Sequence, residues 1–247
     1  MKNIFKNMNK TTKNNFITYG MVVAFYLVVQ TLVLTGSISN LLKGLLVPIC
    51  VYVIAAVSLN LVVGISGELS LGHAGFMCVG AYASAFFSSC VGNALPGAVR
   101  FILAILIGAA VAALFGMLIG IPVLKLRGDY LAIVTLAFGE IIKNLMNIIY
   151  IGKDSNGLHF SIEDTASLGL LEDGKVIVKG ALGITGTPKD SSFTIGIILV
   201  IITLFIVLNL VNSRSGRAIM AIRDNRIAAE SVGINVTKYK LMAFTIS

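Results

Sequence analysis

Two stretches of the chain place charged or hydrogen-bonding side chains within strongly apolar sequence. The first is "LAFGEIIKNLMN" (136–147), in which Glu140 is predicted to lie midway through a membrane span. Lys143 and Asn144 follow at helical spacing, so they share one helix face with Glu140. A lone charge at that depth costs at least about 3 kcal/mol, so this face requires a partner or a water-filled cavity. Two interpretations stay open: a Glu140–Lys143 pair that only holds the bundle together, or a face that lines a pathway, where Gly139 admits a neighbouring helix or a substrate.

The second stretch is "NLVVGISGELSLGHAGF" (60–76), which interrupts an apolar region with glycines, a glutamate and a histidine. A broken helix within hydrocarbon leaves backbone groups unpaired unless protein or water satisfies them. One interpretation is a tight cytoplasmic turn in which Glu68 is solvated and the glycines serve packing. The other is a contribution to a translocation pathway or its gate. The residues predicted for that pathway or gate are Asn60, Ser66, Gly67, Glu68, Ser70, His73, Gly139, Glu140 and Asn144.

A third stretch, "SRSGRAIMAIRDNRIAAESVGINVTKYK" (213–240), carries several basic residues outside the apolar runs. Either Asp224 or Asn225 is expected to cap a short helix that ends at Gly233. Ala228 and Val232 lie one turn apart and form, with Ile227, a small apolar face that suits docking into a groove on a partner. The alternative is a helix lying on the membrane surface. Docking is favoured, because the bulky aromatic residues expected of a surface-bound helix are missing from this face.

The composition is that of a membrane protein. The chain of 247 residues is 57% hydrophobic and 12% charged, with a mean hydropathy of +0.94. Soluble domains carry about 25% charged residues. The net charge of +8 comes from basic residues grouped between apolar runs, without the basic stripe and interleaved aromatics of a nucleic-acid-binding protein. The three cysteines form no C-x-x-C pair, so neither a zinc site nor a disulfide framework is expected.

The apolar runs predict a polytopic, all-α transmembrane bundle with a broken or re-entrant glycine-rich segment. A span needs about 20 helical residues. Runs of that length lie near 16–34, 45–64, 69–91, 99–121, 129–151 and 193–212. After residue 240 the sequence "LMAFTIS" indicates the start of a seventh span. We therefore expect residues 1–247 to be a single transmembrane domain that is truncated at its C-terminus.

The distribution of basic residues predicts the orientation, because cytoplasmic loops are enriched in lysine and arginine. This places the N-terminus and residues 213–240 in the cytoplasm, and an extracytoplasmic loop at 152–192. Arg100 and Lys43 fall on the outer side against this rule, but they are outnumbered. The residues that carry the prediction near the N-terminus and in the inner loop are Lys2, Lys6, Lys10, Lys13, Lys125 and Arg127.

No motif in the chain predicts catalysis. The stretch "GLLEDGKV" (169–176) has the spacing of a phosphate-binding loop, but Val176 replaces the Ser or Thr that would bind Mg²⁺. The two histidines, His73 and His159, are far apart, and the zinc-protease pattern H-E-x-x-H is missing from the sequence. We expect no cofactor, no metal and no enzymatic turnover by this chain alone.

Three stretches together resemble the permease subunit of bacterial branched-chain amino acid ABC importers: "LNLVVGISGELSLGHAGFMCVGAYASA", "LKLRGDYLAIVTLAFGEIIKNLMN" and "SGRAIMAIRDNRIAAESVGINVTKYKLMAF". The resemblance implies a fold of the ribose and vitamin B12 permease type in the bacterial inner membrane. It also implies four kinds of neighbour: a second related permease, two cytoplasmic ATP-binding subunits, an extracytoplasmic binding protein and membrane lipid. One departure is "IGKDSNGL", which has Lys153 and Asp154 where the family has a threonine and glycines.

The resemblance further implies that residues 216–233 resemble the coupling helix that contacts the ATPase. The residues predicted for that contact are Gly216, Arg217, Arg223, Ala228, Ala229, Glu230 and Gly233. The expected function is therefore a pathway-forming, non-catalytic subunit of an ATP-driven importer for branched-chain amino acids. The alternative is an ion-coupled secondary transporter of small polar solutes that uses Glu140 and Glu68 as ion sites near broken helices.

Overall fold

The computed structural model describes residues 10–124, 126, 128–171, 174–188 and 190–247. Lys2, Lys6, Lys125 and Arg127, which entered the topology prediction, lie outside these residues. The α-helices are α1 (Lys10–Leu34), α2 (Asn40–Asn60), α3 (His73–Val91), α4 (Gly97–Val123), α5 (Asp129–Ile148), α6 (Phe193–Asn212), α7 (Arg214–Asp224), α8 (Arg226–Ser231) and α9 (Val236–Ile246). The shorter elements are η1 (Leu61–Ile65), η2 (Gly92–Ala94), η3 (Gly180–Leu182), β1 (Tyr150–Asp154), β2 (Gly157–Ser161) and β3 (Lys175–Lys179).

The predicted spans are confirmed. Within the described residues, six helical segments are long and apolar enough to cross a membrane, and each coincides with one predicted run. The third begins at His73 instead of residue 69, because the glycine-rich residues before it are not helical. The fifth ends at Ile148, because the chain then enters β1. The protein is a multi-pass, mostly helical membrane protein.

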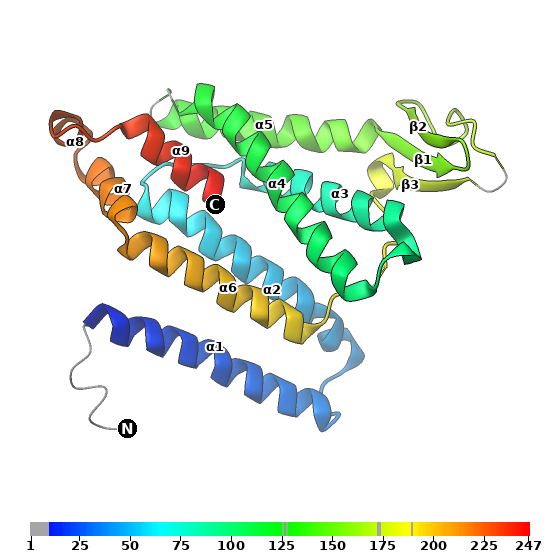
Figure 1. Ribbon diagram of the computed structural model, residues 1–247, viewed down its shortest axis with the longest axis horizontal. Helices are drawn as coiled ribbons and strands as arrows, with labels where there is room; N and C mark the ends of the chain where they lie inside the picture. Colours follow the sequence, from blue (N-terminus) through cyan, green and yellow to red (C-terminus); the bar gives the residue numbers. More distant parts are fainter. Residues whose placement is uncertain (1–9, 125, 127, 172–173, 189) are drawn as a thin grey trace.

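The helices pack in pairs along the long axis of the molecule. α3 packs extensively on α4 and α2 on α6, while α1 lies outermost beside α6 (Figure 1). Close approach of α3 and α4 depends on small residues, since a Cβ added at Gly108 would lie 2.8 Å from the carbonyl oxygen of Gly80. α2 and α6 meet around a buried cluster of Cys50, Ile197 and Val200.

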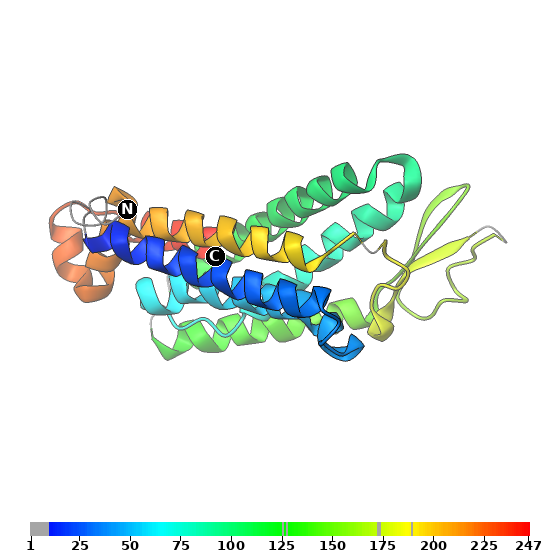
Figure 2. The same cartoon turned by 90° about the horizontal axis from the view of Figure 1, so that it is seen from below.

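The two ends of the bundle carry different structures. α7 and α8 lie at one end, where α1 also begins, and the strands lie at the other (Figures 1 and 2). This arrangement agrees with the predicted topology, which puts the N-terminus and residues 213–240 on one side of the membrane and residues 152–192 on the other.

The loop between α5 and α6 contains a small antiparallel sheet that the sequence analysis did not predict. Its strand order is β2-β1-β3. Leu168, in the stretch between β2 and β3, is buried, and Leu170 packs on Gly152, where a Cβ would lie 2.7 Å from the leucine side chain. The phosphate-loop-like stretch 169–176 leads into β3, whereas a phosphate-binding loop leads into a helix.

Asp154 organises the turn between β1 and β2. Its Oδ1 accepts hydrogen bonds from the backbone N–H groups of Asn156 (2.8 Å) and Gly157 (3.1 Å), and its Oδ2 lies 3.0 Å from Nε2 of His159. Burial raises the pKa of the Asp154 carboxyl, but the hydrogen bond from Asn156 and the contact with His159 outweigh it, so the pKa lies below its ordinary value. Asp154, which departs from the family pattern, therefore stabilises the turn between β1 and β2.

The contacts of Arg100 explain why this basic residue departs from the rule that lysine and arginine gather in cytoplasmic loops. Its side chain is buried at the start of α4 and makes a bidentate ion pair with Asp190, at 2.7 and 2.8 Å, just before α6. It also donates to the carbonyl oxygen of Gly92. A buried arginine that is paired within the chain says little about orientation, because the rule concerns basic residues in loops. The pair ties the beginnings of α4 and α6 together.

Candidate functional site

The glycine-rich stretch connects two consecutive spans. α2 continues as the π-helical turn η1, whose wider hydrogen bonding shows in the Ser66 N–H donating to the Leu61 carbonyl at 3.0 Å. The Glu68 N–H then donates to the carbonyl of Val62 at 3.1 Å. The backbone of the break is thus partly satisfied by the end of its own helix. Gly67 has a φ of +71°, a conformation that favours glycine.

The connection is locked onto α5 by Thr135. The Leu71 N–H donates to Thr135 Oγ1 at 3.1 Å, and a Cβ at Gly72 would lie 2.2 Å from the Thr135 carbonyl oxygen. One turn further, a Cβ at Gly75 would lie 3.0 Å from Cα of Gly139. Of the two roles predicted for Gly139, the structure therefore supports admission of a neighbouring helix, which is α3. Sequence reasoning missed Thr135, whose only signal was a hydroxyl within an apolar run.

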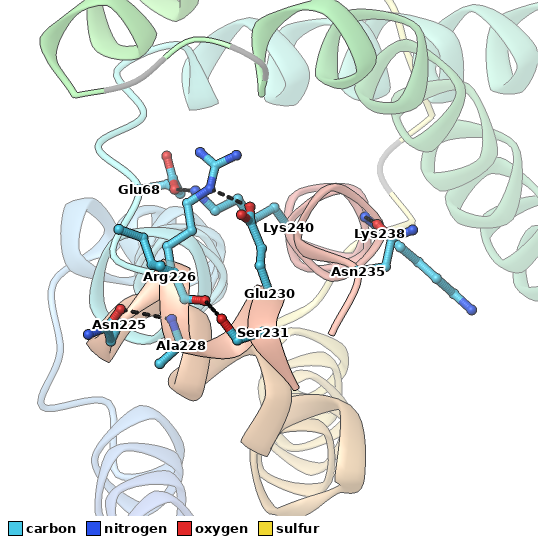
Figure 3. A network of polar contacts seen from close by, with 10 residues as sticks. Glu68, Asn225, Arg226, Ala228, Glu230, Ser231, Asn235, Lys238 and Lys240 are labelled. Carbon is cyan, nitrogen blue, oxygen red and sulfur yellow. Dashed lines mark hydrogen bonds and ion pairs between the residues drawn. The ribbon is translucent and has the colours of Figure 1, made fainter. Parts of the chain in front are cut away.

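Glu68 is neither solvated nor free. Its Oε1 accepts from Nζ of Lys240 in α9, and the two side chains are only 14% and 11% exposed (Figure 3). Beside this pair, Nη1 of Arg223 in α7 donates to the Gly64 carbonyl at 3.0 Å. The Arg223 stem covers Gly67, where a Cβ would lie 2.6 Å from Cγ of the arginine. The break therefore makes three contacts with residues 213–240.

The other predicted residues of the break differ in burial, since Asn60 is exposed, His73 is half-buried and the two serines are buried. Ser66 and Ser70 are buried, and the Asn60 side chain lies over Gly64, where a Cβ would be 2.2 Å from Asn60 Oδ1. His73 lies 3.5 Å from Ser58 through its Nε2. Ser58 and His73 both line an open cavity of about 630 Å³, to which α2, α3, α4 and α9 contribute side chains.

The polar residues of α5 lie differently, because they are exposed on the outside of the described bundle. Lys143 Nζ and Glu140 Oε2 are 3.3 Å apart, with side chains 64% and 55% exposed. Asn144 and Asn147 are exposed on the same helical face. Ionisable groups within a span almost always face a bundle interior or a water-filled cavity. The structure thus brings Glu140, Lys143 and Asn144 together on one face but leaves that face uncovered.

Residues 213–240, hereafter called the coupling segment after the role predicted for them, form the predicted capped helix. Asn225 Oδ1 accepts from the Ala228 N–H at 3.0 Å, and α8 stops before Gly233, whose φ is +82°. Ile227 and Val232 are each 77% exposed, and the Ala228 side chain is exposed beside them. These three residues are hereafter the apolar face of α8. The Arg226–Glu230 ion pair, 2.9 Å long, lies next to this face (Figure 3).

Two residues predicted for the ATPase contact are corrected by their burial. Ala229 packs with Ile222 and Val236 in a core shared by α7, α8 and α9. Gly216 is also buried, and a Cβ there would lie 2.2 Å from the Leu210 carbonyl oxygen at the end of α6. Both are packing residues, because neither presents surface to a partner. The predicted residues that remain exposed are Arg217, Arg223, Ala228, Glu230 and Gly233.

Within the described residues, no three His, Cys, Asp or Glu side chains gather in a way that would hold a metal ion.

The sequence also matches known proteins. Residues 41–247 match the family described as "Branched-chain amino acid transport system / permease component". The chain is 38% identical over 208 residues to the "High-affinity branched-chain amino acid transport system permease protein LivM" of Salmonella typhimurium, and equally to that of Escherichia coli. Each alignment covers 80% of this chain and 47% of the relative, so the chain spans about half the length of these proteins. No solved structure gives a significant match.

Proposed function

The chain belongs to the branched-chain amino acid transport permease family, and from this premise we propose that it forms part of the translocation pathway of an ATP-driven importer for branched-chain amino acids. In this proposal it is a non-catalytic subunit of the bacterial inner membrane with a cytoplasmic N-terminus. Its partners are a second related permease, two cytoplasmic ATP-binding subunits and an extracytoplasmic substrate-binding protein.

The exposed polar face of α5 is the observation that carries the proposal. From Glu140 to Asn147 it extends about 10 Å along the helix, at 1.5 Å per residue, toward the end that leads into the sheet. Contact with lipid is unfavourable for this face, whereas contact with water or a second permease is not. The pair of Glu140 and Lys143 also offers a carboxylate and an ammonium group, which complement the two charges of an amino acid backbone. Ile133 and Leu136 continue the same face with exposed apolar surface.

The apolar face of α8 supports coupling to an ATP-binding subunit. Ile227 and Val232 are far more exposed than branched aliphatic residues usually are. The face is small and rimmed by the Arg226–Glu230 pair, as expected for a short helix that docks in a groove. Because α7, α8 and α9 share a buried core, we expect movement of the docked helix to move all three.

Cysteine accessibility tests the pathway. In the reconstituted complex, Asn144→Cys is expected to react with a membrane-impermeant thiol reagent, in a manner that changes with nucleotide state. Ile141→Cys is the matched control, because Ile141 is also exposed on the same helix but points away from the polar face. Equal protection of both cysteines in every nucleotide state would contradict the proposed pathway.

Uptake by proteoliposomes tests the energy source. Uptake of leucine, isoleucine or valine is expected to require the ATP-binding subunits and ATP. Uptake driven by an ion gradient without those subunits would favour the ion-coupled alternative. That alternative uses Glu68 as an ion site, and the engagement of Glu68 with Lys240 counts against it.

A further inference from the structure

We propose that Glu68, Lys240 and Arg223 are positioning residues that transmit movement of the coupling segment to the connection between α2 and α3, and from there to the polar face of α5. The inference rests on the proposed function, since it identifies the residues by which ATP hydrolysis in a partner would reach the pathway. None of the three touches the proposed pathway face directly.

The first step is the attachment of the coupling segment to the connection. The Glu68–Lys240 ion pair joins positions 172 residues apart in sequence, and both side chains are largely shielded from water. A shielded, charge-assisted hydrogen bond is stronger and more directional than a surface pair. Arg223 adds a second attachment, through its hydrogen bond to the Gly64 carbonyl and its stem on Gly67. Because the two attachments come from different helices, α7 and α9, they restrain both the position of the connection and its distance from the coupling segment.

The second step is the rigidity of the part that moves. Ile222 of α7, Ala229 of α8 and Val236 of α9 are all buried in one cluster. Well-packed interiors transmit displacement because they are close-packed and have low compressibility. A partner that displaces α8 would therefore displace Arg223 and Lys240 with it.

The third step leads from the connection to α5. Leu71 lies three residues after Glu68, and its N–H donates a hydrogen bond to Thr135, while Gly72 lies against the Thr135 backbone. Thr135 is buried on α5, just over one turn before Glu140. The connection is thus held by the coupling segment at Glu68 and by α5 at Leu71. A displacement at Glu68 that preserves these contacts must shift α5 or the start of α3.

The test uses the complete complex and two measurements, the rate of ATP hydrolysis and the rate of amino acid uptake. Glu68→Gln and Lys240→Gln each remove the ion pair but keep a hydrogen-bonding group of similar size. Each is expected to leave subunit co-purification intact and to lower the amino acid taken up per ATP hydrolysed about tenfold. The charge-reversed double variant Glu68→Lys/Lys240→Glu is expected to recover most of that ratio.

Lys238→Gln is the matched control for Lys240→Gln, because Lys238 is an exposed lysine of α9 and its replacement changes the net charge by the same amount. It is expected to leave the ratio unchanged. The inference is overturned if the single variants keep the wild-type ratio, or if they lose both activities together without rescue by the charge reversal. Failure of the proposed function is separate, since it would appear as wild-type uptake that does not depend on ATP.

Discussion

The glycine-rich connection and the polar face of α5 both put charge next to a membrane span, yet the protein treats them in opposite ways. At the connection, Glu68 forms an ion pair with Lys240, and the Leu71 N–H donates a hydrogen bond to Thr135. On α5, Glu140 and Lys143 contact each other and are otherwise exposed. The connection is closed by contacts within this chain, whereas the α5 face is open. Its completion therefore requires contacts from outside the described residues.

This difference separates internal transmission from contact with a substrate or partner. Groups that are satisfied inside the chain hold its parts in register, and changing them is expected to alter stability and coupling. Exposed groups within a span contribute little to the fold of the isolated chain, and changing them is expected to alter transport. The following predictions test that separation.

The largest difference is expected between Glu68→Ala and Glu140→Ala. Removing Glu68 leaves Lys240 largely buried without its partner, which costs about 3–5 kcal/mol. Removing Glu140 breaks an exposed pair and is expected to change stability by about 1 kcal/mol or less. Thermal unfolding of the purified complex measures both, and similar losses for the two variants would contradict the comparison.

Gly72→Ala tests the closed packing of the connection. The new methyl group would overlap the Thr135 carbonyl oxygen, so a loss of about 1–3 kcal/mol is expected from the forced backbone shift. Gly44→Ala is the control, because nothing lies within 4 Å of the added methyl group in α2. Protease resistance of the two variants in detergent reports the difference, and an equally stable Gly72→Ala would show that the connection is loose.

Glu140→Gln tests the open face. Uptake of branched-chain amino acids is expected to fall about tenfold, equivalent to about 1.4 kcal/mol in the transport barrier, because a charge offered to the substrate is lost. Assembly of the complex and its melting temperature are expected to stay near the wild-type values. Uptake at the wild-type rate would assign the Glu140–Lys143 pair to holding the bundle together.

Asp154 is a third carboxylate, held by contacts within the sheet between α5 and α6, and it gives the smallest expected effect. Because its pKa is lowered in the folded protein, its contribution to stability is complete above the ordinary carboxyl pKa and is lost as the pH falls through the lower folded value. Hydrogen exchange of β1 and β2 amides is expected to accelerate only in strong acid. In Asp154→Asn that acid-dependent step should disappear, and its persistence would assign it to another carboxylate.

The spans and the capped helix were predictable because their signals are local. A run of about 20 apolar residues defines a span wherever it occurs, and Asn225 caps a helix that begins at the next residue. The exposure of Ile227 and Val232 also followed from helical spacing. For the same reason, the predicted face at Glu140, Lys143 and Asn144 was correct in its geometry.

The contacts that join these elements were not predictable from one sequence. Glu68 and Lys240 are far apart in the chain, and nothing near either residue specifies the other. The sheet was missed because its strands have five residues each and include glycines and lysines, which weaken the strand signal. Gly216 and Ala229 were assigned to the partner contact because burial depends on tertiary packing that sequence spacing did not reveal.

The Arg100–Asp190 pair has a geometric consequence for the proposed movement of the coupling segment. It joins the first turn of α4 to the residues just before α6, so this end acts as a pivot and the far end of α6, which leads into α7, acts as the free end of a lever. α6 has 20 residues, or about 30 Å at 1.5 Å per residue. A swing of only about 5° over that length displaces the free end by about 3 Å. Small rotations at this pivot therefore correspond to side-chain-sized steps where the ATP-binding partner is proposed to dock.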